Sequence, residues 1–371
     1  MAIETLNSME FPESSGIERG VFVPPECRSA GFDDEYDLRT FIYDAFFVPR
    51  KQAICIICPK LYQFDTVIKH GKFTANGQQL KPKVKLRKGN SDEIWLPCNA
   101  PPESLRIQIG SFDHETTVGI QDNETFRGLW CAVLKSKDND LVWIKDWVNY
   151  HVKVHGLNGL VFFDNGSEQY SLEELHSALI SISGLEKVRV LSAPFRFGPI
   201  TLSPYRHITK FLQAGLLNIA RVRYLQSAAA VLNVDIDELV SPSLNGSIFQ
   251  SAENSPLGYV SFSGRWRYPD ISVKQQFRHK DHILESSDGF CQARKYCVCP
   301  SGPLRHFYWN THTVRAPFLW GASIDRIISS SRMVYWHCRK ITTHWKSQRG
   351  VPPTNQLTDS PETKQVFDRV F

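Results

Sequence analysis

The sequence Val231-Leu232-Asn233-Val234-Asp235-Ile236-Asp237-Glu238-Leu239-Val240 places three carboxylates directly after a short apolar run. Valine, leucine and isoleucine in such a run predict a strand that is covered on both faces. Carboxylates at the end of this strand are costly if they stay dry and unpaired. A divalent cation removes that cost, because carboxylate oxygens are the preferred ligands of Mg²⁺ and Mn²⁺. We therefore expect Asp235 and Asp237 to hold Mn²⁺ or Mg²⁺ in the loop beyond a buried strand.

An upstream segment has the pattern of a strand, a helix and a second strand. Residues 129–134 form an apolar run, and residues 142–155 carry apolar side chains at helical spacing. Gly156 stands where such a helix would stop. Residues 160–163 form a second apolar run that leads into a polar turn. This order predicts a βαβ unit with parallel strands.

Polar residues follow both strands of this unit. Lys135 comes directly after the first strand, and Asp164 and Asn165 follow the second. Ligands of α/β sheets gather at the carboxyl ends of the strands. We therefore expect Lys135, Asp164 and Asn165 to border a ligand site.

The ordered set of motifs resembles one enzyme family. The motif W-x-x-Y-H at residues 147–151 is followed by Gly156, by D-N-G-S at residues 164–167 and by D-I-D-E at residues 235–238. This order, within residues 128–349, resembles glycosyltransferase family 92 and its bacterial relatives of the glycosyltransferase family 2 type. The resemblance implies a GT-A fold, in which a metal at a DxD motif holds the diphosphate of a nucleotide sugar.

The resemblance also implies roles for individual residues. It makes Asp237 the direct metal ligand, with Asp235 reaching the ribose or a metal-bound water. Glu238 would orient the site. Enzymes of this fold commonly add a histidine from the C-terminal region as a further ligand, and His337 and His312 are the candidates.

Donor contacts and the general base involve a wider set of residues. A helix predicted over residues 205–230 would border the nucleotide, and residues 336–346 resemble the closing motif of the family. The expected donor-binding residues are Lys135, Asp164, Asn165, Lys210, Asn218, Arg221, Asp235, Lys346 and Arg349. Inversion, which the analogy favours, requires a general base beside the acceptor hydroxyl. The catalytic candidates are Asp281, Glu285 and Asp288, together with Glu238.

The chain divides near residue 125. Residues 1–125 are rich in turns and proline and contain short apolar runs, such as the half-buried strand pattern of residues 105–109, so they predict a β-rich accessory domain. Residues 126–349 carry the motifs in the order βαβαβαβ, which predicts a doubly wound α/β domain with a mainly parallel sheet. Residues 350–371 are predicted to be a polar, poorly ordered C-terminal tail.

Composition is that of a globular protein. The net charge of +5 is modest for 371 residues, and we expect no nucleic-acid partner. No segment has the roughly 20 apolar residues of a membrane span, and the N-terminus lacks the pattern of a signal peptide. These features predict a cytoplasmic protein, with peripheral contact at the inner membrane face as a further expectation. The nine cysteines are then expected to be reduced.

These features and the resemblance together predict a metal-dependent, hexosyltransferase-like enzyme. It would move a sugar from a nucleotide-sugar donor to a glycan or lipid-linked acceptor, in bacterial surface polysaccharide synthesis. Two other classes stay open. A non-catalytic carbohydrate- or nucleic-acid-binding protein would use the N-terminal part and the aromatic, basic C-terminal segment. A metal-dependent nucleotidyltransferase also places paired carboxylates after a strand.

Overall fold

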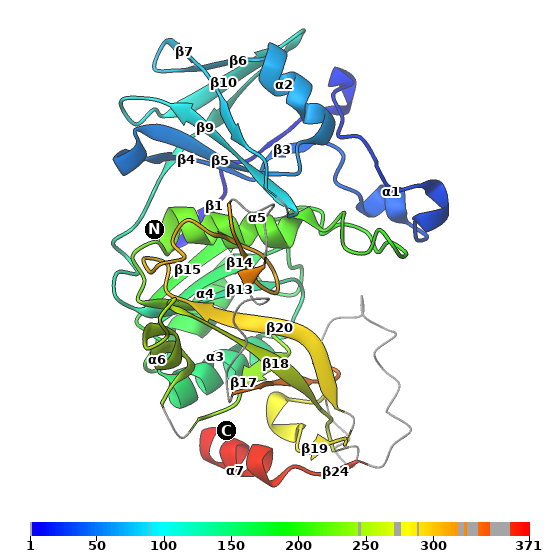
Figure 1. Cartoon of the computed structure of the whole chain (residues 1–371), viewed down its shortest axis with the longest axis vertical. Coiled ribbons are helices and arrows are strands. Elements are labelled where there is room, and N and C mark those ends of the chain that lie inside the picture. Colours follow the sequence, from blue (N-terminus) through cyan, green and yellow to red (C-terminus); the bar gives the residue numbers. More distant parts are fainter. Residues whose placement is uncertain are drawn as a thin grey trace.

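A computed structural model shows the chain as a β-rich N-terminal part that lies against a larger α/β part, with helix α5 (Phe211–Ile219) between them (Figure 1). It describes residues 2–87, 89–243, 246–270, 276–287, 289–317, 323–324, 333–341 and 357–371. The predictions for Asp288, Lys346 and Arg349 lie outside these residues.

The N-terminal part consists mainly of two sheets, which are antiparallel except for the parallel pair β12 and β4. The five-stranded sheet has the order β12-β4-β5-β9-β8, and the four-stranded sheet has the order β11-β10-β6-β7. Their bounds are β4 Asp44–Val48, β5 Ala53–Pro59, β6 Lys72–Ala75, β7 Gln78–Leu80, β8 Lys83–Lys85, β9 Ser91–Pro97, β10 Ser104–Ile109, β11 Phe112–Thr117 and β12 Gly119–Ile120. Strand β10 buries Leu105 and Ile107, as the alternation of residues 105–109 predicted.

The larger part is built on a nine-stranded sheet with the order β1-β15-β14-β13-β16-β20-β18-β23-β17. Its strands are β1 Ile3–Thr5, β13 Trp130–Ser136, β14 Gly159–Asp164, β15 Lys187–Ser192, β16 Ala230–Asn233, β17 Glu238–Val240, β18 Tyr259–Arg267, β20 Phe290–Val298 and β23 Tyr335–Cys338. In the sheet order from β1 to β16 all neighbours pair in parallel, and so do β18 and β23. The pairs β16 with β20, β20 with β18 and β23 with β17 are antiparallel. The sheet is therefore mixed, and the antiparallel pairs that the prediction did not include all lie in its second half.

Helices connect the parallel strands in the predicted order. They are α3 Leu141–His155, α4 Leu172–Ile180 and α5, which continues as a π-helical turn over Ala220–Tyr224. Helix α3 ends at Gly156, whose φ of 76° is left-handed, and α4 begins with the capping box of Ser171 and Glu174. The helix predicted over residues 205–230 is shorter at both ends, because turns precede it and a turn separates it from β16.

The remaining elements are short, apart from one C-terminal helix. They are α1 Phe32–Glu35, α2 Asp65–His70, α6 Ile248–Glu253, α7 Pro361–Val370, β2 Met9–Glu10, β3 Thr40–Ile42, β19 Leu284–Glu285, β21 Tyr308–Trp309, β22 Val314–Arg315 and β24 Thr358–Asp359. Among the described residues, no helix combines the length and apolar character that crossing a membrane requires.

Both chain ends differ from the predicted domain limits. Strand β1 pairs in parallel with β15, so the N-terminus belongs to the large sheet and not to the N-terminal sheets. Helix α7 buries Val366 and Phe367, and Lys153 Nζ on α3 donates a hydrogen bond of 2.6 Å to the carbonyl oxygen of Val370. The prediction of a poorly ordered tail is therefore wrong for residues 361–370, because an apolar stripe recurs there at helical spacing.

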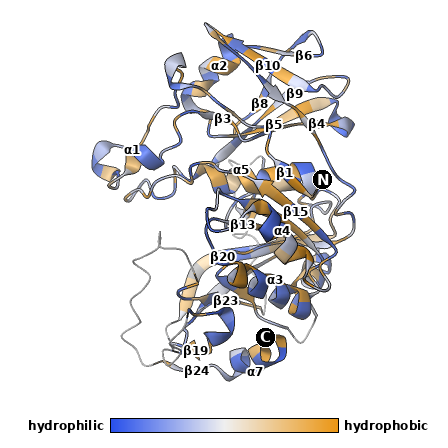
Figure 2. Cartoon of the chain, turned by 180° about the vertical axis from the view of Figure 1, so that it is seen from behind, coloured by the Kyte–Doolittle hydropathy of each residue, from blue (hydrophilic) through white to orange (hydrophobic). Residues whose placement is uncertain are grey.

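Helix α5 carries apolar residues on nearly all of its faces, and nearly all of its residues are buried. Figure 2 shows its hydrophobic colouring between the N-terminal strands and the large sheet. It contacts β5 and β9 of the N-terminal sheet and β13 of the large sheet. A helix with this character is a buried one, and here it joins the two parts of the chain.

Candidate metal and donor site

The strand order of the large sheet reverses beside β13. From β13 the chain continues to β14 and β15 on one side, and it returns to β16 on the other. Lys135 near the end of β13 and Asp235 beyond the end of β16 meet across this point, with 2.9 Å between Lys135 Nζ and Asp235 Oδ1. In open α/β sheets, ligands bind in the crevice at such a switch point.

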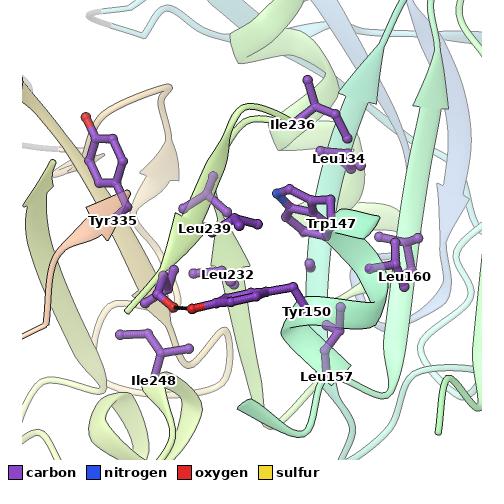
Figure 3. Close-up of a cluster of buried hydrophobic side chains, with 14 of the residues drawn as sticks. Leu134, Trp147, Tyr150, Leu157, Leu160, Leu232, Ile236, Leu239, Ile248 and Tyr335 are labelled. Atoms are coloured by element: carbon purple, nitrogen blue, oxygen red, sulfur yellow. Dashed lines mark hydrogen bonds between the residues drawn. The ribbon is translucent and has the colours of Figure 1, made fainter. Parts of the chain in front are cut away.

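The backbone of the acidic loop is held by helix α3. Trp147 Nε1 lies 3.0 Å from the carbonyl oxygen of Asp235 and 2.9 Å from that of Glu238. Tyr150 Oη donates a hydrogen bond of 2.8 Å to the carbonyl oxygen of Val240. In Figure 3, Trp147 and Tyr150 project from the helix towards the strand and loop that carry these carbonyls. The aromatic residues of W-x-x-Y-H thus fix the shape of the D-I-D-E segment.

The histidines of helix α3 are structural. His151 Nδ1 lies 2.9 Å from the carbonyl oxygen of Trp147, and His155 Nε2 lies 2.9 Å from that of Val240. Both rings are buried, and burial lowers the pKa of His155 to about 4, so this ring is neutral. Both rings thus bond to main-chain carbonyls of the interior.

Three side chains of the site form a candidate set of metal ligands. Asp237, Glu238 and His337 each offer one ligand atom, and these atoms lie within 4.8 Å of one another. All three residues are at most 5% exposed. His337 reaches the acidic loop because β23 pairs with β17, in the register Glu238 with His337. Two carboxylates and an imidazole, gathered in a buried place, are therefore ready to share a cation.

A divalent cation fits this donor set. Ligands at about 2.0–2.1 Å from an octahedral cation lie about 3–4 Å apart, so small side-chain shifts bring the three atoms to bonding distance. Carboxylate oxygens suit Mn²⁺ and Mg²⁺, whereas the imidazole favours a transition metal over Mg²⁺. Asp237 and His337 were predicted as ligands. Glu238, which was expected to orient the site, lies in the set, whereas the predicted ligands Asp235 and His312 do not.

Charge interactions in the site are strong because the groups are buried. Burial alone would lower the pKa of His337, but Asp237, Cys291 and Glu238 together outweigh burial and raise that pKa to about 9. Burial raises the pKa of Glu238, although Lys295 opposes it. Hydrogen bonding also ties the two ends of the loop, since Glu238 Oε2 accepts from the backbone N–H of Asp235 at 2.8 Å.

Lysines hold Asp235 on both of its oxygens. Lys135 Nζ lies 2.9 Å from Oδ1, and Lys295 Nζ lies 2.5 Å from Oδ2. Lys295 is also 3.0 Å from Glu238 Oε2 and is fully buried. Burial would lower the pKa of Lys295, but Asp235 and Glu238 outweigh burial and keep it above its usual value. Sequence reasoning did not assign Lys295 a role, although a lysine among the apolar residues of β20 was a signal.

The D-N-G-S turn lies at the same edge of the sheet, beside the end of β13. Asp164 accepts hydrogen bonds from the backbone N–H groups of Gly166 at 3.1 Å and Ser167 at 2.9 Å. Asn165 Nδ2 donates to the carbonyl oxygens of Ala193 at 2.6 Å and Phe195 at 2.8 Å. These bonds shape the turn, and donor binding by Asp164 and Asn165 stays a prediction.

The donor-binding candidates on and beside helix α5 have structural partners. Arg221 forms an ion pair of 2.6 Å with Glu93 on β9, and Asn218 Nδ2 donates to the carbonyl oxygen of Trp309 at 2.8 Å. Lys210 precedes the helix and lies 4.6 Å from the centre of the Phe197 ring. Arg221 therefore joins α5 to the N-terminal sheet, and its contacts give the donor-binding prediction no support.

The other catalytic and metal candidates lie in different surroundings. Asp281 Oδ2 accepts a hydrogen bond of 2.7 Å from the backbone N–H of Arg278, and Glu285 forms an ion pair of 3.0 Å with Arg267. His312 Nδ1 lies 3.0 Å from the carbonyl oxygen of Arg294. The three ligand atoms that converge in the described residues do not include His312, so its role as a ligand stays a prediction.

Comparison with known proteins gives no family for the chain. No protein-family model matches it, and no curated protein matches it. Solved structures that resemble parts of it include the bifunctional glycosyltransferase WbbM, with 13% identity and a TM-score of 0.29 over 54% of this chain and 36% of that one. The galactosyltransferase LgtC, in complex with donor and acceptor sugar analogues, has 15% identity and a TM-score of 0.26 over 47% of this chain and 59% of that one.

A third similar structure is core-mannan synthase A from Aspergillus fumigatus in its Mn/GDP form. It has 12% identity and a TM-score of 0.27 over 49% of this chain and 55% of that one. In all three cases the match spans less than two thirds of the other protein. TM-scores below 0.5 do not establish a shared fold, and these similarities assign no function to the chain.

Proposed function

We propose that the chain is a metal-dependent glycosyltransferase of GT-A fold that uses a nucleotide-sugar donor and a glycan or lipid-linked acceptor. One observation carries the proposal: the ligand set of Asp237, Glu238 and His337 lies beside Lys135 and Lys295 at the switch point of the sheet. Carboxylates without neighbouring lysines would suit a site that binds only a cation. Buried positive charge next to them suits a ligand that brings both a cation and phosphates.

The proposed roles follow from these positions. Asp237, Glu238 and His337 would hold Mn²⁺ or Mg²⁺, which supplies charge neutralisation for the departing diphosphate. Lys135 and Lys295 hold the Asp235 carboxylate at the mouth of the parallel strands, where it is partly exposed and can accept hydrogen bonds from ribose hydroxyls. Because the loop is fixed by α3, these groups need little rearrangement to meet the donor.

Finer parts of the proposal rest on the order of sequence motifs. These are membership of the family 92 group, inversion with Asp281 or Glu285 as general base, and action on bacterial surface polysaccharide. A cytoplasmic site of action with peripheral membrane contact belongs to the same set.

The test is calorimetric titration of the full chain with Mn²⁺, followed by a panel of nucleoside diphosphates and nucleotide sugars. Asp237→Asn should weaken Mn²⁺ binding by more than about 100-fold, the upper end of the effect of an outer-shell partner, because it removes a direct ligand. The matched control is Asp140→Asn, since Asp140 caps helix α3 and asparagine caps equally well. Equal Mn²⁺ affinity of Asp237→Asn and the unaltered chain would refute the metal site.

Reaction products separate the enzyme classes. Transfer or slow hydrolysis of a nucleotide sugar releases a nucleoside diphosphate, whereas nucleotidyl transfer consumes a nucleoside triphosphate and releases pyrophosphate. Release of pyrophosphate would favour the nucleotidyltransferase. Tight sugar binding without any turnover, across the whole donor panel with Mn²⁺, would favour the non-catalytic alternative.

A further inference from the structure

The imidazole of the candidate metal site is bonded on its second nitrogen as well. His337 Nε2 lies 3.0 Å from Asp237 Oδ2, whereas Nδ1 lies 3.7 Å from Cys291 Sγ. Cys291 Sγ lies 3.0 Å from Tyr335 Oη, and Tyr335 Oη lies 2.7 Å from the carbonyl oxygen of Ala293. A chain of hydrogen bonds thus runs from the metal ligand to the main chain of β20.

The carbonyl oxygen at the end of this series of hydrogen bonds determines which group donates in each bond. The hydroxyl of Tyr335 lies within donor distance of both Cys291 Sγ and the carbonyl oxygen of Ala293, and it has a single proton. Because a backbone carbonyl only accepts hydrogen bonds, we assign this proton to the bond with Ala293. The lone pairs of Tyr335 Oη are then free to accept the thiol proton of Cys291. The sulfur of Cys291 in turn accepts the proton on Nδ1 of His337. Each bond in this order has one donor and one acceptor.

We infer that Cys291 and Tyr335 are positioning residues that keep a proton on His337 Nδ1 and thereby present Nε2 to the cation beside Asp237. The part that concerns the cation rests on the proposed function. Histidines that bind metals almost always donate their other N–H to a carboxylate, a carbonyl or water, which fixes the tautomer and the ring orientation. In this chain a thiol and a phenol take that place.

The surroundings hold the chain of hydrogen bonds in position. Cys291 is 9% exposed, and Tyr335 is fully buried. The indole of Trp266 stacks on the His337 ring, with 4.0 Å between ring centroids and 25° between planes. The nearest carboxylate that competes for Nδ1 is Glu238 Oε1 at 4.0 Å, which is beyond hydrogen-bond distance.

Gly264 makes room for the phenol. A Cβ atom at Gly264 would lie 2.3 Å from Cζ and 2.7 Å from Oη of Tyr335, so a larger residue would displace the ring. Strand β18 carries this glycine opposite Tyr335 in the parallel pairing with β23. The position of the Tyr335 hydroxyl, and with it the series of hydrogen bonds from His337 to Ala293 (the relay), therefore depends on a residue without a side chain.

The first test measures Mn²⁺ affinity of the full chain by calorimetry. Cys291→Ala and Tyr335→Phe should each weaken binding by about 10- to 100-fold, the usual effect of a partner behind a metal ligand. Cys291→Ser should lose less than Cys291→Ala, because a hydroxyl also accepts and donates. Cys299→Ala removes a buried thiol just beyond the same strand and should leave the affinity unchanged. Loss of affinity in neither Cys291→Ala nor Tyr335→Phe would overturn the inference.

The second test observes the proton itself and keeps the two proposals apart. Long-range ¹⁵N–¹H spectra of histidine-labelled chain with diamagnetic Zn²⁺ should show His337 protonated on Nδ1 and bound through Nε2, with His337→Gln identifying the signals. Tyr335→Phe, which removes one oxygen and little packing, should shift the Nδ1 signals even if Cys291→Ala does not fold. A ring bound through Nδ1 would overturn the relay. Failure of the unaltered chain to bind Mn²⁺, with Nδ1 still protonated and sensitive to Tyr335→Phe, would overturn the proposed function alone.

Discussion

Trp147 Nε1 lies 3.0 Å from the carbonyl oxygen of Asp235, and the same N–H lies 2.9 Å from the carbonyl oxygen of Glu238. One indole thus holds both ends of the acidic loop. The carbonyls between them are also engaged, that of Ile236 by His279 at 2.8 Å and that of Asp237 by the N–H of Cys338 at 2.8 Å. The loop is preorganised, so its carboxylates keep their positions with no ligand present.

Replacing this indole tests the role of the loop geometry. Trp147→Phe should lower the free energy of unfolding by about 1–3 kcal/mol, the cost of leaving buried carbonyls without a donor, and should also weaken Mn²⁺ binding. Trp143→Phe is the matched control, because Trp143 Nε1 donates to the carbonyl oxygen of Phe277 at 2.8 Å, outside the loop. Urea unfolding and calorimetry measure the two effects. Equal Mn²⁺ affinity in both variants would show that the indole serves folding only.

The parts of the site that follow from local pattern were predictable. Apolar spacing predicted the helix at residues 142–155, and the run before Asp235 predicted a buried strand with acid at its end. The contact of Lys295 with Asp235 could not be predicted from local pattern. It depends on the antiparallel pairing of β20 with β16, between segments about 60 residues apart. Sequence reasoning identifies elements better than it identifies which distant elements become neighbours.

The surroundings of helix α5 also could not be predicted from local pattern. Its sequence predicted a helix next to the buried strand, but not that the N-terminal sheet would cover it. Arg221 was predicted to bind the donor; it pairs with Glu93 across the contact between the two parts, and donor binding by Arg221 stays a prediction. The presence of Glu238 and the absence of Asp235 in the ligand set also depend on distant elements. Lys135 and Lys295, which form ion pairs with Asp235, both come from other strands.

The contact between the two parts of the chain should depend on pH. Glu93 is buried between Arg87 at 2.9 Å and Arg221 at 2.6 Å. Burial would raise its pKa, but Arg221 and Arg87 outweigh burial and lower the pKa from 4.5 to about 2. A carboxyl group whose pKa is lower in the folded state stabilises the fold above its unfolded pKa, and this stabilisation is lost as the pH falls from 4.5 towards about 2.

Glu93→Gln should therefore lower stability at pH 7 by on the order of 3 kcal/mol and approach the unaltered chain as the pH falls below about 4. Urea unfolding at several pH values measures this difference. Glu115→Gln, at an exposed carboxylate of the N-terminal part, controls for the loss of one negative charge. A deficit of Glu93→Gln that stays constant from pH 7 to pH 3 would exclude the ionised contact as its cause.

Helix α7 should contribute to the stability of the large part. Phe367 is 3% exposed, with its ring centroid 5.6 Å from that of Trp336 and 6.2 Å from that of Tyr150. Phe367→Ala should cost about 3–5 kcal/mol, as for other large aromatic residues in a core. Phe371→Ala is the control, because this ring is 37% exposed. A change within about 0.5 kcal/mol for Phe367→Ala, measured by urea unfolding, would instead support a tail that contributes nothing.

Lys295 should matter for both stability and ligand binding. Lys295→Met keeps the length of the side chain but leaves Asp235 and Glu238 without their shared cation, which should cost about 3–5 kcal/mol. Lys135→Met should cost less, because the ion pair of Lys135 involves only Asp235, which Lys295 still holds. Adding Asp235→Asn to Lys295→Met should recover part of the stability, because it removes the repulsion between the carboxylates of Asp235 and Glu238 that Lys295 no longer offsets.

The same variants separate folding from binding. If Lys295 also faces the donor phosphates, the double variant should recover stability without recovering affinity for a nucleoside diphosphate. Thermal unfolding followed by calorimetry with GDP and UDP in Mn²⁺ gives both quantities on one sample. Recovery of diphosphate affinity together with stability would show that Lys295 serves the acidic loop and leaves phosphate binding to Lys135.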